Sequence, residues 1–141
     1  MKKLLGAMLA LTLGVGVGGA SAYVVALVHP PSGHMPVKRT EFVQTGAIMA
    51  PLTFPDGRLS GYVSFEVQLE VPAGEGESVK AKLPLLLNAV NMRTYRTPLA
   101  SGQDGLIPAL DPFRKVVIDA AREIYGDGLV HRAVVTQASP V

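Results

Sequence analysis

The N-terminal segment constrains this chain of 141 residues more than any other part of it. Two lysines, Lys2 and Lys3, precede 25 residues that carry no charge, from Leu4 to Val28. At a helical rise of about 1.5 Å per residue this segment reaches roughly 37 Å, enough to cross a hydrocarbon core of about 30 Å. Because the lysines come first, the positive-inside bias places the N-terminus in the cytoplasm. We therefore expect residues 1–28 to be a single-pass membrane anchor.

A cleaved signal peptide over residues 1–22 is the alternative interpretation of this segment. It would have a charged start, an apolar middle, and a cleavage site of small residues from Ala20 to Ala22. The apolar run continues past Ala22 as far as Val28, however, and is longer than a signal peptide needs. We favour the uncleaved anchor. Under both interpretations the rest of the chain is exported.

Small residues recur at every fourth position of the apolar segment. A stripe of this kind lets helix backbones approach each other closely in a membrane and favours helix association. The residues in register are Gly6, Ala10, Gly14, Gly18, Ala22 and Ala26. The alternative explanation is compositional, because anchors and signal sequences are rich in Gly and Ala. Gly16 and Gly19, which lie outside the stripe, fit that explanation.

The exported part divides into a spacer, residues 29–40, and one domain, residues 41–141. Three prolines and a glycine between His29 and Val37 resist helix formation. Without Lys2 and Lys3, the 13 basic residues become 11, which balances the 11 acidic ones. A neutral domain argues against binding to nucleic acid, which needs clustered Lys and Arg. The absence of cysteine excludes disulfides and Cys-ligated metal, and a bacterial periplasm suits such a domain.

The periodicity of the domain predicts strands first. Thr40 to Leu52 reads as one bent strand or two short ones around Gly46, followed by a turn at Phe54 to Gly57. The clearest pattern runs from Tyr62 to Val71, where apolar and polar residues alternate. A period of two indicates a strand with one buried face.

Two helices and a closing strand are predicted after these strands. Glu77 and Ser78 would cap the first helix, which carries Pro84 in its first turns and repeats Leu83, Leu86, Leu87 and Val90 at helical spacing. Asp111 and Pro112 would open the second helix, with apolar residues from Phe113 to Ile124. A glycine-rich stop then precedes a strand from Leu129 to Gln137.

These elements predict the fold class. It is α+β, with a single N-terminal transmembrane helix followed by a small sheet that has two helices packed on one side.

No cofactor, metal or catalytic site is predicted. Phosphate loops, dinucleotide fingerprints, nucleophile elbows and zinc motifs are all missing from the sequence. His29, His34 and His131 are read as surface residues. Glu66 and Glu70, about 13 Å apart along one strand face, are too distant for paired glycosidase carboxylates and are read as a solvated face. Arg93 and Arg96 around Tyr95 are read as helix-end cations, in preference to a ligand or partner site.

The order of the elements resembles the FliL family of flagellar basal body-associated proteins. The resemblance covers the anchor of residues 1–28 and the domain from about residue 41 to 138. It includes the strand that follows Asp56-Gly57-Arg58, the helix from Leu83 towards Tyr95, and a second helix that runs into a β-branched closing strand.

The resemblance implies an inner-membrane protein whose periplasmic domain has a stomatin-like fold. It further implies that the domain assembles into homo-oligomeric rings and supports the stator units of the flagellar motor, affecting motility and chemotaxis, without catalysis. The alternative from another class is an exported periplasmic module that binds a small ligand or an envelope protein.

Overall fold

A three-stranded antiparallel sheet forms the base of the domain, which the computed structural model describes over residues 38–141. The strands are β1 (Thr40–Thr53), β2 (Leu59–Pro72) and β5 (Arg132–Pro140), and they lie side by side in the order β1-β2-β5. Strand β2 is therefore central, and β1 and β5 are the two edges. Strand β2 pairs antiparallel with both β1 and β5.

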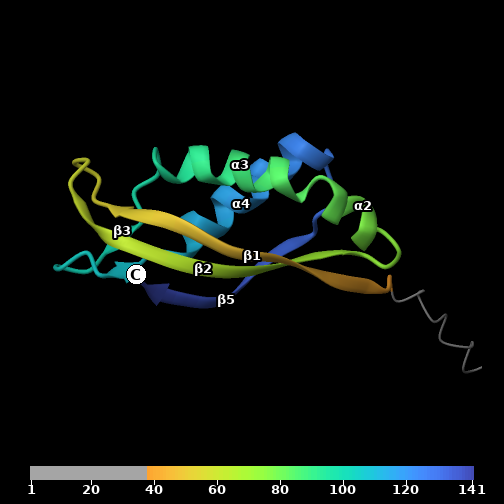
Figure 1. Ribbon diagram of the computed structural model, residues 1–141, viewed down its shortest axis with the longest axis horizontal. Coiled ribbons are helices and arrows are strands. Elements are labelled where there is room, and N and C mark those ends of the chain that lie inside the picture. Colours follow the sequence, from red (N-terminus) through yellow and green to blue (C-terminus); the bar gives the residue numbers. More distant parts are fainter. Residues whose placement is uncertain (1–37) are drawn as a thin grey trace, which may run out of the picture. The chain divides into compact units, whose positions relative to one another are not determined.

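The helices α2 (Gly76–Ala81), α3 (Leu83–Thr94) and α4 (Leu110–Tyr125) cover one face of this sheet. Figure 1 shows α3 and α4 above the strands, with α2 beside the connection that leaves β2. Helix α3 packs over the β1 side and α4 over the β5 side. The α+β class with its small antiparallel sheet is confirmed.

The alternation from Tyr62 to Val71 predicted a strand with one buried face, and the structure confirms it. Every second residue of β2 faces the helices and is buried, namely Val63, Phe65, Val67, Leu69 and Val71. At the centre of the core, the ring of Phe65 stacks on that of Phe113 from α4, with 3.7 Å between ring centroids. Burial of these side chains fixes which face of the sheet the helices cover.

Strand β1 is a single strand with a bend, one of the two forms predicted. Its pairing with β2 shifts between Gln44 and Ala47, where Gly46 has a φ of 78°. Glycine tolerates this left-handed conformation, and the extra residue turns the strand locally. The predicted turn from Phe54 to Gly57 is present, closed by a hydrogen bond from the Gly57 N–H to the Phe54 carbonyl (2.9 Å).

The first predicted helix is divided, and its predicted cap is wrong. Glu75 occupies the N-cap of α2 without a side-chain cap, and the Gly76 N–H donates to the Glu41 carboxylate at 2.5 Å. Lys82 separates α2 from α3, because Pro84 lies in the first turn of α3 and cannot continue a helix from upstream. Pro84 itself is where the sequence predicted it.

The connection between α3 and α4 contains a short hairpin that the sequence did not reveal. Strands β3 (Ala100–Ser101) and β4 (Ile107–Pro108) pair antiparallel. The tip of this hairpin packs on the start of β2, where the Ser60 hydroxyl donates to the Asp104 carbonyl (2.9 Å). Helix α4 begins at Leu110 with Ala109 as N-cap, so the prediction that Asp111 caps the helix is wrong by two residues.

The closing strand begins later than predicted. The hydrogen-bonded ladder of β5 starts at Arg132 and continues to Pro140, whereas the prediction ran from Leu129 to Gln137. Leu129 and Val130 are half-buried against the core but lie in the connection from α4. The apolar composition of this segment therefore indicates burial against the core, and it does not indicate membership in the hydrogen-bonded sheet.

No helix within residues 38–141 is long and apolar enough to cross a membrane. The predicted anchor, its signal-peptide alternative and most of the predicted spacer lie outside the described residues.

Candidate partner-binding groove

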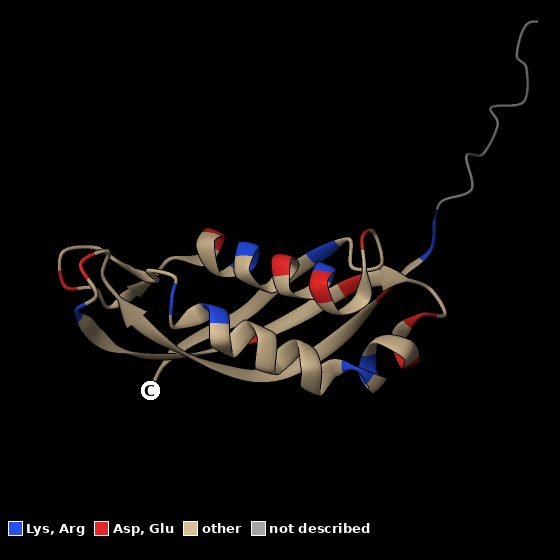
Figure 2. Ribbon diagram, turned by 90° about the horizontal axis from the view of Figure 1, so that it is seen from above, with Lys and Arg blue, Asp and Glu red and all other residues tan. Residues whose placement is uncertain are grey.

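A groove of about 1040 Å³ runs between α3 and α4 on the side that faces away from the sheet. Figure 2 looks down on this side and shows the two helices next to each other above the strands. The groove is an open trough whose walls are the outer faces of the two helices. The α3 wall includes Leu85, Ala89 and Met92, and the α4 wall includes Pro112, Val116 and Ile124.

The α3 wall is apolar beyond the needs of the core. Leu86 and Val90 are fully buried beneath the helix, and they account for its packing on the sheet. Leu85 and Met92 point elsewhere and are 58% and 56% exposed. The two residues lie two helical turns apart and line the groove together with Ala89. A contiguous exposed apolar patch is typical of contact surfaces.

The α4 wall adds charged side chains to its apolar ones, namely Asp111, Lys115, Asp119 and Glu123. Figure 2 shows the coloured charged residues following one another along α4, while the only one within α3 is Arg93 near its end. The Lys115 ammonium donates to the Asp119 carboxylate at 2.6 Å, and Arg122 donates to the same carboxylate at 3.2 Å. The hydrogen bond from Lys115 holds the pKa of Asp119 below its ordinary value of 3.8, against the opposing effect of desolvation.

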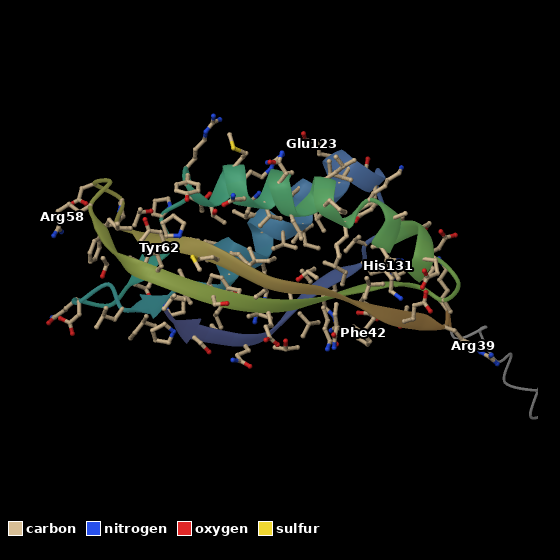
Figure 3. All side chains as sticks on the ribbon, in the orientation of Figure 1. Arg39, Phe42, Arg58, Tyr62, Glu123 and His131 are labelled. Atoms are coloured by element: carbon tan, nitrogen blue, oxygen red, sulfur yellow. The ribbon has the colours of Figure 1, made fainter. Side chains whose placement is uncertain are left out.

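One ion pair joins the two walls. The Arg93 guanidinium of α3 donates to the Glu123 carboxylate of α4, and Figure 3 shows Glu123 on the outer side of the helix layer. Both side chains are part-exposed, at 39% and 59%. An exposed pair of this kind is worth only about 0–1 kcal/mol, so it adds little to the stability of the fold.

Of the cations that the sequence singled out, Arg93 and Arg96 both line the groove. Tyr95 lies outside it, is 63% exposed and borders a second hollow with Met49 and Tyr62. Arg93 is thus a helix-end cation that also bridges two helices. Sequence reasoning missed Glu123, Leu85 and Met92. The sequence did contain one indication for Leu85 and Met92. Helix α3 is apolar nearly all round, and these two residues lie off the face that carries Leu86 and Val90.

Glu66 and Glu70 lie on the open face of the sheet, as predicted from strand alternation. Glu70 accepts hydrogen bonds from Thr40 at 3.1 Å and from Arg132 at 2.9 Å, so it links β2 to both edge strands. His131 is exposed just before β5, at the place labelled in Figure 3. None of these residues meets another titratable group in a catalytic arrangement among the described residues.

Within residues 38–141 no three His, Asp or Glu side chains come close enough together to hold a metal ion. The stripe from Gly6 to Ala26, with His29 and His34, lies outside the described residues, so it stays a prediction.

Comparison with known proteins adds no assignment. No protein-family model, curated protein or solved structure matches this chain.

Proposed function

We propose that this chain is a non-enzymatic protein of the bacterial inner membrane that works as FliL proteins do, by associating with the stator units of the flagellar motor. In this proposal residues 1–28 anchor the chain with its N-terminus in the cytoplasm. Residues 41–141 form a periplasmic domain of stomatin-like fold. Its partners are the membrane, further copies of the chain in a ring, and proteins of the stator and basal body.

The groove between α3 and α4 is the observation that carries this proposal. It combines exposed apolar side chains, Leu85 and Met92, with charges of both signs on the facing helix. That combination resembles the apolar centre and polar rim of protein interfaces. The order of strands and helices, which is also the basis of the FliL resemblance, gives the proposal its second support.

The mechanism in this proposal is mechanical. The anchor holds the domain beside a membrane complex, and a ring multiplies contacts that are individually weak. Close packing of the membrane helices along the Gly14 and Gly18 stripe would add to the same assembly. No cofactor takes part.

The test begins with the N-terminal mass of the chain recovered from membrane and periplasmic fractions. An intact Met1 in the membrane fraction is expected. Deletion of the gene is expected to impair swimming in soft agar, and replacement of Gly14 and Gly18 by Leu is expected to weaken helix association in a membrane reporter. Normal swimming after deletion would contradict the motor role, whatever the fractionation shows.

An exported binding module is the second candidate, favoured by the size of the groove. A volume of about 1040 Å³ is at the upper end of small-molecule sites, which run to about 1,000 Å³. This candidate predicts a chain that starts at Tyr23 and is recovered from the periplasm. It also predicts intact swimming and an altered envelope when the gene is deleted.

A further inference from the structure

One stripe of residues along α3 repeats at alternating spacings of three and four. It begins at the N-cap, runs through the helix and ends just beyond the C-cap, and its members are Lys82, Leu85, Ala89, Met92 and Arg96. A backbone hydrogen bond of 3.0 Å from the Arg96 N–H continues the helical course into that residue. The last four members line the groove between α3 and α4. This spacing is the one by which a helix packs along another helix.

The stripe has an apolar centre and two cationic ends. Leu85 and Met92 are largely exposed, and so are Lys82 and Arg96. At about 1.5 Å per residue, the two cations are separated by about 21 Å along the helix axis. A partner that covers the apolar centre therefore meets a positive charge at each end.

Neither end cation has a carboxylate partner within residues 38–141. Lys82 and Arg96 take part in none of the ion pairs of this region. The other two cations in the same situation, Lys38 and Arg39, precede β1 and lie outside the groove. The two positive charges at the ends of the stripe are thus available to a bound molecule.

The carboxylates that line the groove are already ion-paired within the chain. The pairs are Asp111 with Arg114, Asp119 with Lys115, and Glu123 with Arg93. Helix α4 consequently has no spare carboxylate for the ends of the α3 stripe. The charge that is missing from the groove is negative.

Charge argues against the occupants that this chain could itself supply. Residues 1–37 contain no Asp or Glu, so they offer nothing to pair with the two cations. The α3 stripe of a second copy would place Lys82 opposite Arg96 in an antiparallel contact, and each cation opposite its own counterpart in a parallel one. Like charges that face each other oppose association. The carboxylates of a second α4 are ion-paired as in the first.

We propose that the groove binds an amphipathic helix of another protein, with apolar residues at its centre and acidic residues near both ends. The apolar residues pack on Leu85, Ala89 and Met92. The acidic residues, about four helical turns apart, pair with Lys82 and Arg96. An open trough along two helices suits a third helix laid between them. The inference rests on the proposed function, because it names the kind of segment that a partner protein presents to the groove.

Binding of two synthetic peptides to the full chain in nanodiscs of zwitterionic lipid tests the proposal. Both peptides are amphipathic helices with a leucine stripe of the same alternating spacing. One carries Glu at both ends of the stripe, and the other carries Lys there. Fluorescence anisotropy, with empty nanodiscs as the blank, is expected to show binding at least about tenfold tighter for the Glu-ended peptide. Equal binding, tighter binding of the Lys-ended peptide, or binding of neither would overturn the proposal.

Charge reversal in the chain separates ion pairing from apolar packing. Arg96→Glu leaves one attractive and one repulsive end for either peptide, so it is expected to remove the preference. Arg96→Glu combined with Lys82→Glu is expected to reverse it. Arg39→Glu, also exposed and without an ion pair but outside the groove, is the matched control and is expected to keep it. An unchanged preference in the double variant, or a reversal in Arg39→Glu, would contradict the proposal.

A second copy as occupant is tested by oxidising Met92→Cys, since the natural chain has no cysteine. The yield of covalent dimer is expected to be no higher than for Leu106→Cys, on the exposed hairpin away from the groove. A clear excess with Met92→Cys would assign the groove to a second copy and overturn the proposal. These measurements contain no stator protein, so a failure of the motor role would not alter the peptide preference. Loss of the preference would equally leave the motor role to be decided by co-purification.

Discussion

Helices α3 and α4 lie side by side on the same sheet, yet their sequences satisfy different demands. In α4 the buried residues, such as Phe113 and Val117, form one face, and most of the exposed positions carry charged residues. In α3 the buried face is as well defined, with Leu86 and Val90, but Leu85 and Met92 are apolar and exposed. The difference shows that α3, more than α4, exposes large apolar side chains on the outer side of the helix layer, which is where our proposal places a contact surface.

The largest effect is expected where α4 enters the core. Phe113→Ala removes the ring that stacks on Phe65 and leaves a cavity, so the free energy of unfolding should fall by about 3–5 kcal/mol. Urea unfolding followed by circular dichroism measures this loss. A loss below about 1 kcal/mol would mean that the stacked pair is not the centre of the core.

A neighbouring pair of residues in α3 sharpens the comparison further. Leu86→Ala should reduce the free energy of unfolding by about 2–5 kcal/mol, because its side chain is fully buried. Leu85→Ala, one residue away and mostly exposed, should change it by less than about 0.5 kcal/mol. Equal losses in the two variants, measured by the same urea titration, would show that Leu85 belongs to the core and not to a contact surface.

The smallest effect concerns the charged face of α4. The pKa of Asp119 is lowered in the folded state, chiefly by Lys115, so its ion pairs stabilise the fold above the unfolded pKa near 3.8. This contribution is lost as the pH falls through the lower folded pKa. Because its partners Lys115 and Arg122 are largely exposed, at 76% and 60%, the loss should stay below about 1 kcal/mol. Between pH 5 and pH 2.5 the melting temperature should fall less for Asp119→Asn than for the natural chain. Equal falls would show that the Asp119 carboxylate does not contribute to the pH dependence of stability.

The parts of the fold that depend on strict periodicity could be predicted from the sequence. Residues Tyr62 to Val71 alternate so regularly that only one face could be buried, and Pro84 could lie only in a first helical turn. The boundaries at Asp111 and Leu129 could not be predicted. Helix α4 starts where the β3–β4 hairpin ends, and β5 starts where it begins to pair with β2. Contacts between segments distant in the sequence therefore determine where both elements begin.

The groove depends on tertiary structure in the same way. Arg93 could be recognised as a helix-end cation, but its partner Glu123 lies 30 residues along the chain on another helix. Leu85 and Met92 fit a helical pattern whether they are buried or exposed. Only the placement of α3 over the β1 side of the sheet, with α4 beside it, decides that these two side chains remain outside.

The most direct test of the central claim is co-purification of the flagellar stator proteins with the chain from membranes of cells that express it at its natural level. Met92→Glu is compared with the natural chain, and Leu106→Glu, on the exposed hairpin away from the groove, is the matched control. The account predicts that stator proteins co-purify with the natural chain and with Leu106→Glu, and at least about tenfold less with Met92→Glu, as for loss of about 1.4 kcal/mol at an interface. Absence of stator proteins from the natural complex, or equal recovery with both variants, would contradict the claim that the outer face of α3 binds the motor.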